Sequence, residues 1–314
     1  MLDLGPDSVD GTPSCLMTGS DNPMPGSSGT LRRRLGDYLW VVREKYVDEE
    51  LLRQLRQPAR FFAASAEFLK PEQTGRTTVA LVRSSHPGLR EFVAKRYRST
   101  SSWQLFKDSL RRSRALRSFE LGLRLCEIEV PTAVPVAAGE RRVAGCLLDS
   151  WLVTLYEPDT MPMHLFNARC RDLLRRQRVA QDLAMIFARL HDACLSHSDP
   201  SLANFLVKSA APPGTSVVLI DLDGLRPTRS NGRKPAARDL RRLLRRGRFL
   251  RGERLRFLSA YCHFRKKRIA PRDLLPLMGP LPERVSYRPF AFDNAEPSDC
   301  PFESSSASAS LVKE

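Results

Sequence analysis

Two short segments near the middle of the chain constrain its fold more than any other feature. Residues 197–204 read H-S-D-P-S-L-A-N, and residues 217–221 read V-V-L-I-D. A continuous apolar run that ends in an acid is typical of a strand buried on both faces. The loop between Asp199 and Asn204 turns back on itself. We therefore expect the side chains of Asp199, Asn204 and Asp221 to face one cleft.

The order H-x-D-x-x-x-x-N, followed by a strand that ends in Asp, is the order that protein-kinase-like phosphotransferases use. Mg²⁺ prefers oxygen ligands, which Asn204 and Asp221 supply. Asp199 suits the catalytic base, because a carboxylate near an acceptor hydroxyl can take its proton. His197 completes the catalytic loop and is expected to hold its backbone through the ring nitrogens. The alternative is an unrelated loop His, capping Asp and turn Asp, but the full set in order favours the catalytic interpretation.

A lysine that would reach the nucleotide phosphates lies upstream. Residues 91–97 alternate as a strand does, and their V-A-K resembles the V-A-I-K pattern with Lys95 in the lysine position. Residues 77–82 are the expected preceding strand. Residues 72–77, at the start of that strand, are the expected phosphate-covering loop. Gly75 is its one glycine, and the backbone N–H groups of the loop could bind phosphate. The alternatives are a solvated strand lysine and an ordinary turn.

The expected partner of Lys95 lies on the following helix, which is predicted over Trp103 to Cys126. Glu120 is the only Glu between Lys95 and Cys126, so it is the default partner. The alternative is an exposed helix Glu that pairs with Arg117 or Arg124 at three- and four-residue spacing. The sequence leaves both open.

Taken together, these residues give the chain a similarity to a known family. From about Thr77 to about Tyr261 it resembles the lipopolysaccharide kinase (Kdo/WaaP) family, a bacterial branch of the protein-kinase-like fold. The stretches that carry the resemblance are V-A-K-R-Y at 93–97, the Pro-flanked 130–140, L-H-D-A-C-L-S-H-S-D at 190–199, N-F-L at 204–206 and L-I-D-L-D at 219–223.

The resemblance implies an α+β, two-lobed kinase fold, with a small β-rich N-lobe and a larger, mainly helical C-lobe. It also implies ATP- and Mg²⁺-dependent phosphorylation of a heptose or Kdo in the lipopolysaccharide inner core. Asp199 would be the base, Asn204 and Asp221 would bind Mg²⁺, and Lys95 would bind the nucleotide phosphates. Many members carry an acid where this chain has Ser118.

Charge is concentrated along the chain. The formal net charge is +16, and residues 233–254 hold ten Lys or Arg against Asp239 and Glu253. Such a cluster attracts anionic surfaces, meaning phosphorylated glycolipid or acidic membrane lipid. The other interpretation is a solvated helix face. No nucleic-acid-binding motif accompanies the arginines, which argues against a nucleic-acid partner.

Several function classes find no support in the sequence. No run approaches the roughly 18 apolar residues of a membrane span, and the N-terminus lacks the pattern of a signal peptide. The seven cysteines are scattered without C-x-x-C spacing, as expected in a reducing compartment. These patterns predict a cytoplasmic protein, with peripheral attachment at the inner face of the inner membrane as a possibility.

The predicted organisation has four parts: a disordered segment over 1–30, an N-lobe over 31–157, a C-lobe over 158–286 and a flexible tail over 287–314. Within the lobes, the apolar spacing predicts a helix over 31–57, strands near 134–138 and 143–156, an amphipathic helix over 170–193, and a basic helical region over 237–258 that is interrupted near Gly247.

Two other functions stay open at this point. One is transfer to a different small-molecule or protein hydroxyl, because the motifs supply the transfer machinery and not the acceptor pocket. The other is a nucleotide-binding pseudokinase scaffold, which the single Gly75 favours and the intact Asp199, Asn204 and Asp221 oppose. Asp223 is ambiguous too, since it would either assist the metal or cap the turn at Gly224.

Overall fold

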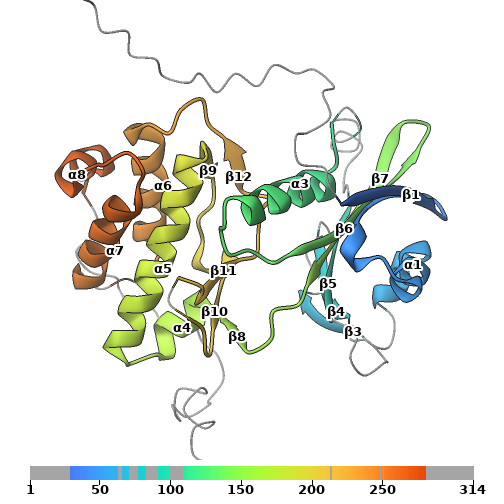
Figure 1. The fold of residues 1–314 in the computed structure, drawn as a ribbon, viewed down its shortest axis with the longest axis horizontal. Coiled ribbons are helices and arrows are strands. Elements are labelled where there is room, and N and C mark those ends of the chain that lie inside the picture. The colour runs from blue at the N-terminus through green and yellow to red at the C-terminus, as the bar shows by residue number, and fades with distance from the viewer. Residues whose placement is uncertain are drawn as a thin grey trace, which may run out of the picture.

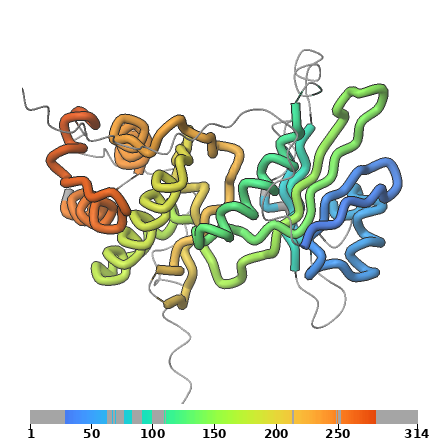
Figure 2. The backbone as a smooth tube through the Cα atoms, turned by 45° about the horizontal axis from the view of Figure 1, so that its top comes forward, coloured from blue at the N-terminus to red at the C-terminus, as the bar shows by residue number. Residues whose placement is uncertain are grey.

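The protein divides into a β-sheet part and a helical part, as Figures 1 and 2 show from two directions. The computed structural model describes residues 29–62, 66–70, 77–82, 91–98, 109, 111–212, 214–247, 249 and 251–280. This is the predicted α+β, two-lobed architecture. The terminal segments predicted as flexible lie almost wholly outside these residues. Within them, no helix combines the length and the apolar character needed to cross a bilayer.

The N-terminal part is built on one seven-stranded sheet of order β1-β2-β6-β7-β5-β4-β3, in which all neighbours are antiparallel. Its strands are β1 (Thr30–Leu35), β2 (Tyr38–Arg43), β3 (Ala66–Lys70), β4 (Thr77–Val82), β5 (Phe92–Arg98), β6 (Pro135–Val143) and β7 (Cys146–Leu155). Short 3-10 helices, η1 (Glu44–Tyr46) and η2 (Pro58–Phe62), flank the helix α1 (Glu49–Arg56).

The sheet is covered on both faces. Helix α3 (Arg114–Glu127) packs through Ala115 and Phe119 on the face that carries Tyr97. The opposite face carries Ala94 and Trp151 and packs against α1 and η2. Since successive strand residues point to opposite faces, Lys95 shares the α3 face with Tyr97. This alternation is the one predicted for residues 91–97.

The prediction of one helix over residues 31–57 is wrong. This stretch forms the β1–β2 hairpin and then α1. Its turn is at Gly36, whose φ of 59° is a left-handed conformation that favours glycine. In β2 the burial alternates, with Trp40 and Val42 buried and Leu39 exposed, which is the strand period of two. Only the end of the stretch is helical, where Asp48 caps α1 by accepting a 2.6 Å hydrogen bond from Leu51 N.

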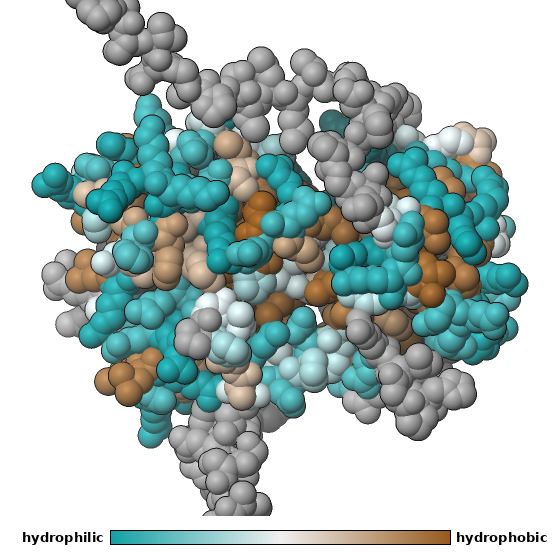
Figure 3. All heavy atoms as spheres, in the orientation of Figure 1, coloured by the Kyte–Doolittle hydropathy of each residue, from teal (hydrophilic) through white to brown (hydrophobic). Residues whose placement is uncertain are grey.

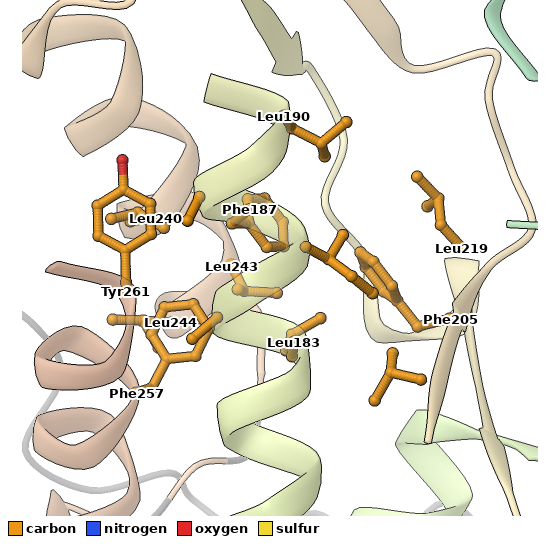
Figure 4. Close-up of a cluster of buried hydrophobic side chains, with 14 of the residues drawn as sticks. Leu183, Phe187, Leu190, Phe205, Leu219, Leu240, Leu243, Leu244, Phe257 and Tyr261 are labelled. Atoms are coloured by element: carbon orange, nitrogen blue, oxygen red, sulfur yellow. The ribbon is translucent and has the colours of Figure 1, made fainter. Parts of the chain in front are cut away.

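The C-terminal part is mainly helical, as predicted. Its helices are α4 (Met163–Arg169), α5 (Leu173–Asp192), α6 (Arg233–Arg246), α7 (Arg251–Phe264) and α8 (Pro271–Met278). Figure 4 shows its core, where α5 lies between α6 and α7 on one side and a small sheet on the other. Phe187 of α5 is fully buried, with its ring centroid 5.9 Å from that of Phe205 and 6.4 Å from that of Phe257.

The small sheets of the C-terminal part carry the loops of interest. β8 (Thr160–Pro162), β10 (Phe205–Lys208) and β11 (Val217–Leu219) form one sheet of order β11-β10-β8. β9 (Leu195–His197) and β12 (Leu225–Pro227) form the other, and the 3-10 helix η4 (Leu202–Asn204) precedes β10. The segment between α3 and β6 contacts β11 as well, through a 2.8 Å hydrogen bond from Thr132 Oγ1 to the carbonyl of Leu219. This contact links the two parts.

Candidate active site

Backbone pairing brings the two predicted segments to one place. β10 pairs with β11, and Ile220 N donates a 2.9 Å hydrogen bond to the carbonyl of Asn204. β9 pairs with β12, and Ser198 N donates a 2.8 Å hydrogen bond to the carbonyl of Gly224. The first contact places Asn204 next to the start of the loop that carries Asp221. The second holds the residue before Asp199 against the far end of that loop.

His197 is fully buried at the end of β9. Its Nδ1 accepts a hydrogen bond from the backbone N of Asp199 at 3.3 Å. Burial lowers the pKa of His197, and the opposing influence of nearby Asp221, Asp239 and Asp199 does not cancel that effect. A neutral imidazole with Nδ1 as acceptor holds the backbone at Asp199, the predicted base.

Asp239 of α6 contacts the start of the same loop, and it was not identified as a site residue from the sequence. It is fully buried, and it accepts hydrogen bonds from His197 N at 2.7 Å and Ser196 Oγ at 2.9 Å, with His191 Nε2 at 3.3 Å. Its position was the available signal. An acid three residues after Ala236 and one before Leu240 lies on the apolar face of an otherwise basic helix.

Asp199 and Asn204 are joined by a hydrogen bond across their loop. Asn204 Nδ2 donates to the backbone carbonyl of Asp199 at 2.9 Å. The carboxylate of Asp199 is 61% exposed, so a substrate hydroxyl can reach it. Arg246 of α6 contacts its Oδ1. The structure thus brings the predicted base and the predicted metal-binding amide together.

Lys95 reaches across from the sheet to Asp221. The distance from its Nζ to Asp221 Oδ1 is 2.9 Å. Burial would raise the pKa of Asp221, but the ammonium of Lys95 outweighs it, so the pKa of Asp221 lies below its usual value. Burial likewise would lower the pKa of Lys95, and the surrounding Tyr97, Asp223 and Asp221 more than compensate, so this lysine stays charged.

Asp223 has more hydrogen-bond partners than the sequence suggested. Its carboxylate accepts from Tyr97 OH at 3.1 Å and from Ser118 Oγ at 2.8 Å, and it lies 3.4 Å from Lys95 Nζ. It therefore ties α3 and β5 to the loop after Asp221, rather than only capping the turn at Gly224. Tyr97 was not identified as a site residue from the sequence, and Ser118 stands where many family members carry an acid.

Glu120 is not placed against Lys95. Its carboxylate pairs with Arg112 Nη1 at 2.8 Å, near the exposed start of α3. The reason is helical geometry, because Ser118 is on the buried face at 3% exposure and Glu120, two residues later, turns away from it. Thus Ser118, and not Glu120, lies near Lys95, where it hydrogen-bonds to Asp223. Gly75, the expected phosphate-loop glycine, lies outside the described residues.

The chemistry of the residues present fits a divalent metal ion. Asn204 Nδ2 donates its hydrogen bond to the Asp199 carbonyl, so Asn204 Oδ1 is available as an oxygen ligand. Asp221 adds a carboxylate that is ionised at neutral pH. No group of three or more His, Cys, Asp and Glu arranged as a metal site occurs among the described residues. An amide oxygen and a carboxylate are ligands of the kind that Mg²⁺ takes when nucleotide phosphates supply the rest of its coordination.

The comparisons with known proteins agree with this geometry. The family model described as "Lipopolysaccharide kinase (Kdo/WaaP) family" matches residues 60–261, which is more than half of the chain. This chain belongs to that family. It is therefore a kinase of the lipopolysaccharide kinase family, and membership of a kinase family implies the use of ATP. A search of curated proteins found no match.

The chain is also similar to solved structures. A structure titled "WaaP in complex with acyl carrier protein" is 21% identical, with a TM-score of 0.50, and the match covers 73% of this kinase and 91% of that chain. The BubR1 kinase domain matches at 14% identity and a TM-score of 0.37, over 70% of this chain and 56% of that one. The M. tuberculosis PknI kinase domain matches at 18% and 0.38, over 58% and 70%. At this identity, the WaaP match shows the protein-kinase-like fold.

Proposed function

We propose that this kinase transfers the γ-phosphate of ATP, with Mg²⁺, to a hydroxyl of a lipopolysaccharide inner-core sugar, a heptose or Kdo. The observation that carries the proposal is the assembly of Lys95, Asn204 and Asp221 beside an exposed Asp199. Phosphoryl transfer depends mainly on positioning and on charge neutralisation, and these four side chains are the groups that such a reaction needs. The family supplies the class of acceptor.

Each side chain has one task in this reaction. Asp199 accepts the proton of the acceptor hydroxyl while the acceptor oxygen bonds to the γ-phosphorus, and the bond from that phosphorus to the β–γ bridging oxygen breaks to release ADP. Lys95 binds the nucleotide phosphates as a fixed cation. Asn204 and Asp221 would hold Mg²⁺, which would neutralise charge on the phosphates. His197 and Asp239 position the loop.

The proposed setting follows from the acceptor. The kinase works in the cytoplasm, peripheral at the inner face of the inner membrane, where a lipid-linked saccharide would be presented. The basic stretch over 233–254 supports contact with an anionic surface there. The pairing of Glu120 with Arg112 keeps a second candidate open, which is a nucleotide-binding scaffold without transfer.

The test incubates purified protein with Mg-ATP and deacylated lipopolysaccharide core and measures added phosphate by mass spectrometry. Asp199→Asn is expected to lower the rate by about a hundredfold or more, because it removes the base. Asp37→Asn, the same change at an exposed hairpin residue, is the control and should match the wild type. Phosphate transfer that Asp199→Asn leaves intact would contradict the assignment of the base. ATP binding without transfer to any core would favour the scaffold or another acceptor.

A further inference from the structure

Helix α6 contacts the catalytic loop with two arginines that lie one helical turn apart. Arg242 Nη1 donates to the carbonyl of Ser198 at 3.2 Å, and Arg246 hydrogen-bonds to Oδ1 of Asp199, the proposed base. Residues four apart share a face of a helix, so both guanidinium groups point to the same side of α6. This arrangement places two positive charges beside the exposed carboxylate of Asp199.

The contact between Arg246 and Asp199 is easily exchanged. The two side chains are 59% and 61% exposed, and an ion pair in that setting adds little stability. The contact also occupies a carboxylate oxygen that has to accept a proton during transfer. An acceptor that offers Arg246 a better partner would therefore free the base as it binds.

The better partner is an oxyanion. A guanidinium binds phosphate or carboxylate through two parallel hydrogen bonds, and such charge-assisted bonds are stronger than neutral ones. The exposed face of α6 offers no competing acid, because the single acid of the helix, Asp239, is fully buried under the loop. Hydrophilic side chains gather over the α6 and α8 region in Figure 3, so a charged ligand meets a polar surface there. The exposed cations of α6 are Arg233, Lys234, Arg238, Arg242, Arg245 and Arg246.

We propose that Arg242 and Arg246 form an acceptor subsite for a phosphate or carboxylate carried by the acceptor saccharide, and that this oxyanion draws Arg246 away from Asp199. The inference rests on the proposed function and names the chemical class of its acceptor: a saccharide with an anionic group near the reacting hydroxyl. A helix face that merely faced solvent would not direct two arginines onto the loop backbone and the base.

The buried side of α6 makes the subsite rigid. Asp239, one turn before Arg242, accepts a hydrogen bond from the backbone N of His197. This bond holds the helix and the loop in a fixed position relative to each other. The subsite can therefore set the distance from the acceptor's oxyanion to its reacting hydroxyl. We infer that it selects among hydroxyls as well as among saccharides.

The first test measures binding and does not require turnover. Calorimetry compares deacylated lipopolysaccharide core with the same core after phosphatase treatment and after chemical reduction of its carboxylates. Loss of about tenfold in affinity with either treatment is expected, and the treatment that causes it identifies the oxyanion. Arg242→Gln and Arg246→Gln should lose the same affinity, and should no longer distinguish treated from untreated core. Equal affinity of wild-type protein for all three cores would overturn the proposal.

The second test separates binding from chemistry. Arg246→Gln should raise KM for the anionic core about tenfold while KM for ATP stays constant, and Arg246→Lys should recover part of the loss. Arg256→Gln, an equal change at an exposed residue of α7, is the matched control. A rise in KM for ATP, or an equal loss on neutral and anionic acceptors, would contradict the subsite. Should the wild type bind the core selectively and transfer no phosphate, the proposed function would fail and the subsite would stand.

Discussion

Asp239 Oδ2 accepts a 2.7 Å hydrogen bond from the backbone N of His197, across 42 residues of sequence. The same carboxylate accepts from Ser196 Oγ at 2.9 Å. A buried carboxylate is tolerated when donors surround it, and here the donors belong to the strand that leads into the catalytic loop. Asp239 therefore fixes the position of the loop that carries Asp199 without itself touching any proposed reacting group.

Replacing Asp239 should destabilise the fold more than any exposed acid would. Asp239→Ala leaves the buried N–H of His197 and the partly buried hydroxyl of Ser196 without this acceptor, so we expect a loss of about 3 kcal/mol in the free energy of unfolding. Asp239→Asn keeps one acceptor oxygen and should lose less. Urea unfolding measures both, with Glu127→Ala at the exposed end of α3 as control. A loss no larger than the control's would show that the loop does not depend on this carboxylate.

The catalytic segments could be predicted because their chemistry fixes local spacing. The predicted base and the predicted amide ligand, at 199 and 204, belong to one loop. Val217, Val218 and Leu219 are buried as the composition of their run indicates, whereas Ile220, next to Asp221, is exposed. The strand of Lys95 was predictable for the same kind of reason, since alternation over 91–97 is a local property. Burial, spacing and residue type sufficed for these elements.

The partners of these residues could not be predicted, because they come from distant parts of the chain. Ser118 and Asp223 are 105 residues apart, and no local pattern joins them. Glu120 was chosen from its residue type alone. The orientation of α3 about its axis turns Ser118, and not Glu120, toward the site. Arg246, which contacts Asp199, belongs to the basic run over 233–254. Residue type alone could not show whether that run contacts the loop or only faces solvent.

The stretch over 31–57 shows how tertiary pairing overrides local periodicity. Its leucines and valine recur at three- and four-residue intervals, which favours a helix. Pairing of β2 with β6 decides otherwise: Trp40 lies opposite Gly139, and the missing side chain there leaves room for the indole ring. A glycine a hundred residues away is not visible to a local pattern.

Lys95 should be required for nucleotide use. It remains charged between Asp221 and Asp223, so it presents a fixed cation to the phosphates. Lys95→Met is expected to lower kcat/KM for ATP by about a hundredfold or more. Circular dichroism checks the fold, because the change leaves two carboxylates without their cation. Lys267→Met, at an exposed lysine, is the control; equal activity in the two variants would refute the role of Lys95.

Glu120 should be dispensable where Ser118 is not. Glu120→Gln breaks only a partly exposed pair with Arg112, so the rate should stay within about twofold of wild type. Ser118→Ala removes the 2.8 Å hydrogen bond to Asp223, a loss of about 1 kcal/mol in positioning that should lower the rate severalfold. Steady-state kinetics with Mg-ATP compares them. A hundredfold loss in Glu120→Gln would mean that Glu120 moves to Lys95 when nucleotide binds.

The stability of the protein should fall as the pH drops below about 6.5, the usual pKa of histidine. Burial lowers the pKa of His191 and of His197 in the folded chain, and neighbouring carboxylates only partly oppose this. The unfolded chain therefore binds more protons in this range. By linkage the free energy of unfolding decreases by up to about 1.4 kcal/mol per pH unit for each histidine, until the pH reaches the folded-state pKa.

Urea unfolding between pH 7.5 and 5.5 measures this slope, above the range in which carboxylates titrate. His191→Asn should reduce the slope whatever its effect on stability at pH 7.5. His263→Asn changes an exposed histidine and should leave the slope as it is. A slope that is identical in all three proteins would show that the buried imidazoles are not its source.

Gly224 should be irreplaceable at the end of the loop that carries Asp221. A Cβ on this residue would stand 2.6 Å from His197 Cε1 and 2.8 Å from Nδ1, closer than side chains pack. Gly224→Ala should displace the imidazole that holds Asp199 N, costing about 1–3 kcal/mol in stability and most of the activity. Gly252→Ala, whose nearest neighbour would be Arg256 Nη1 at 3.7 Å, is the matched control and should be neutral or slightly stabilising. Kinetics and urea unfolding of both variants decide the matter: if Gly224→Ala kept full activity, His197 would not be what positions the base.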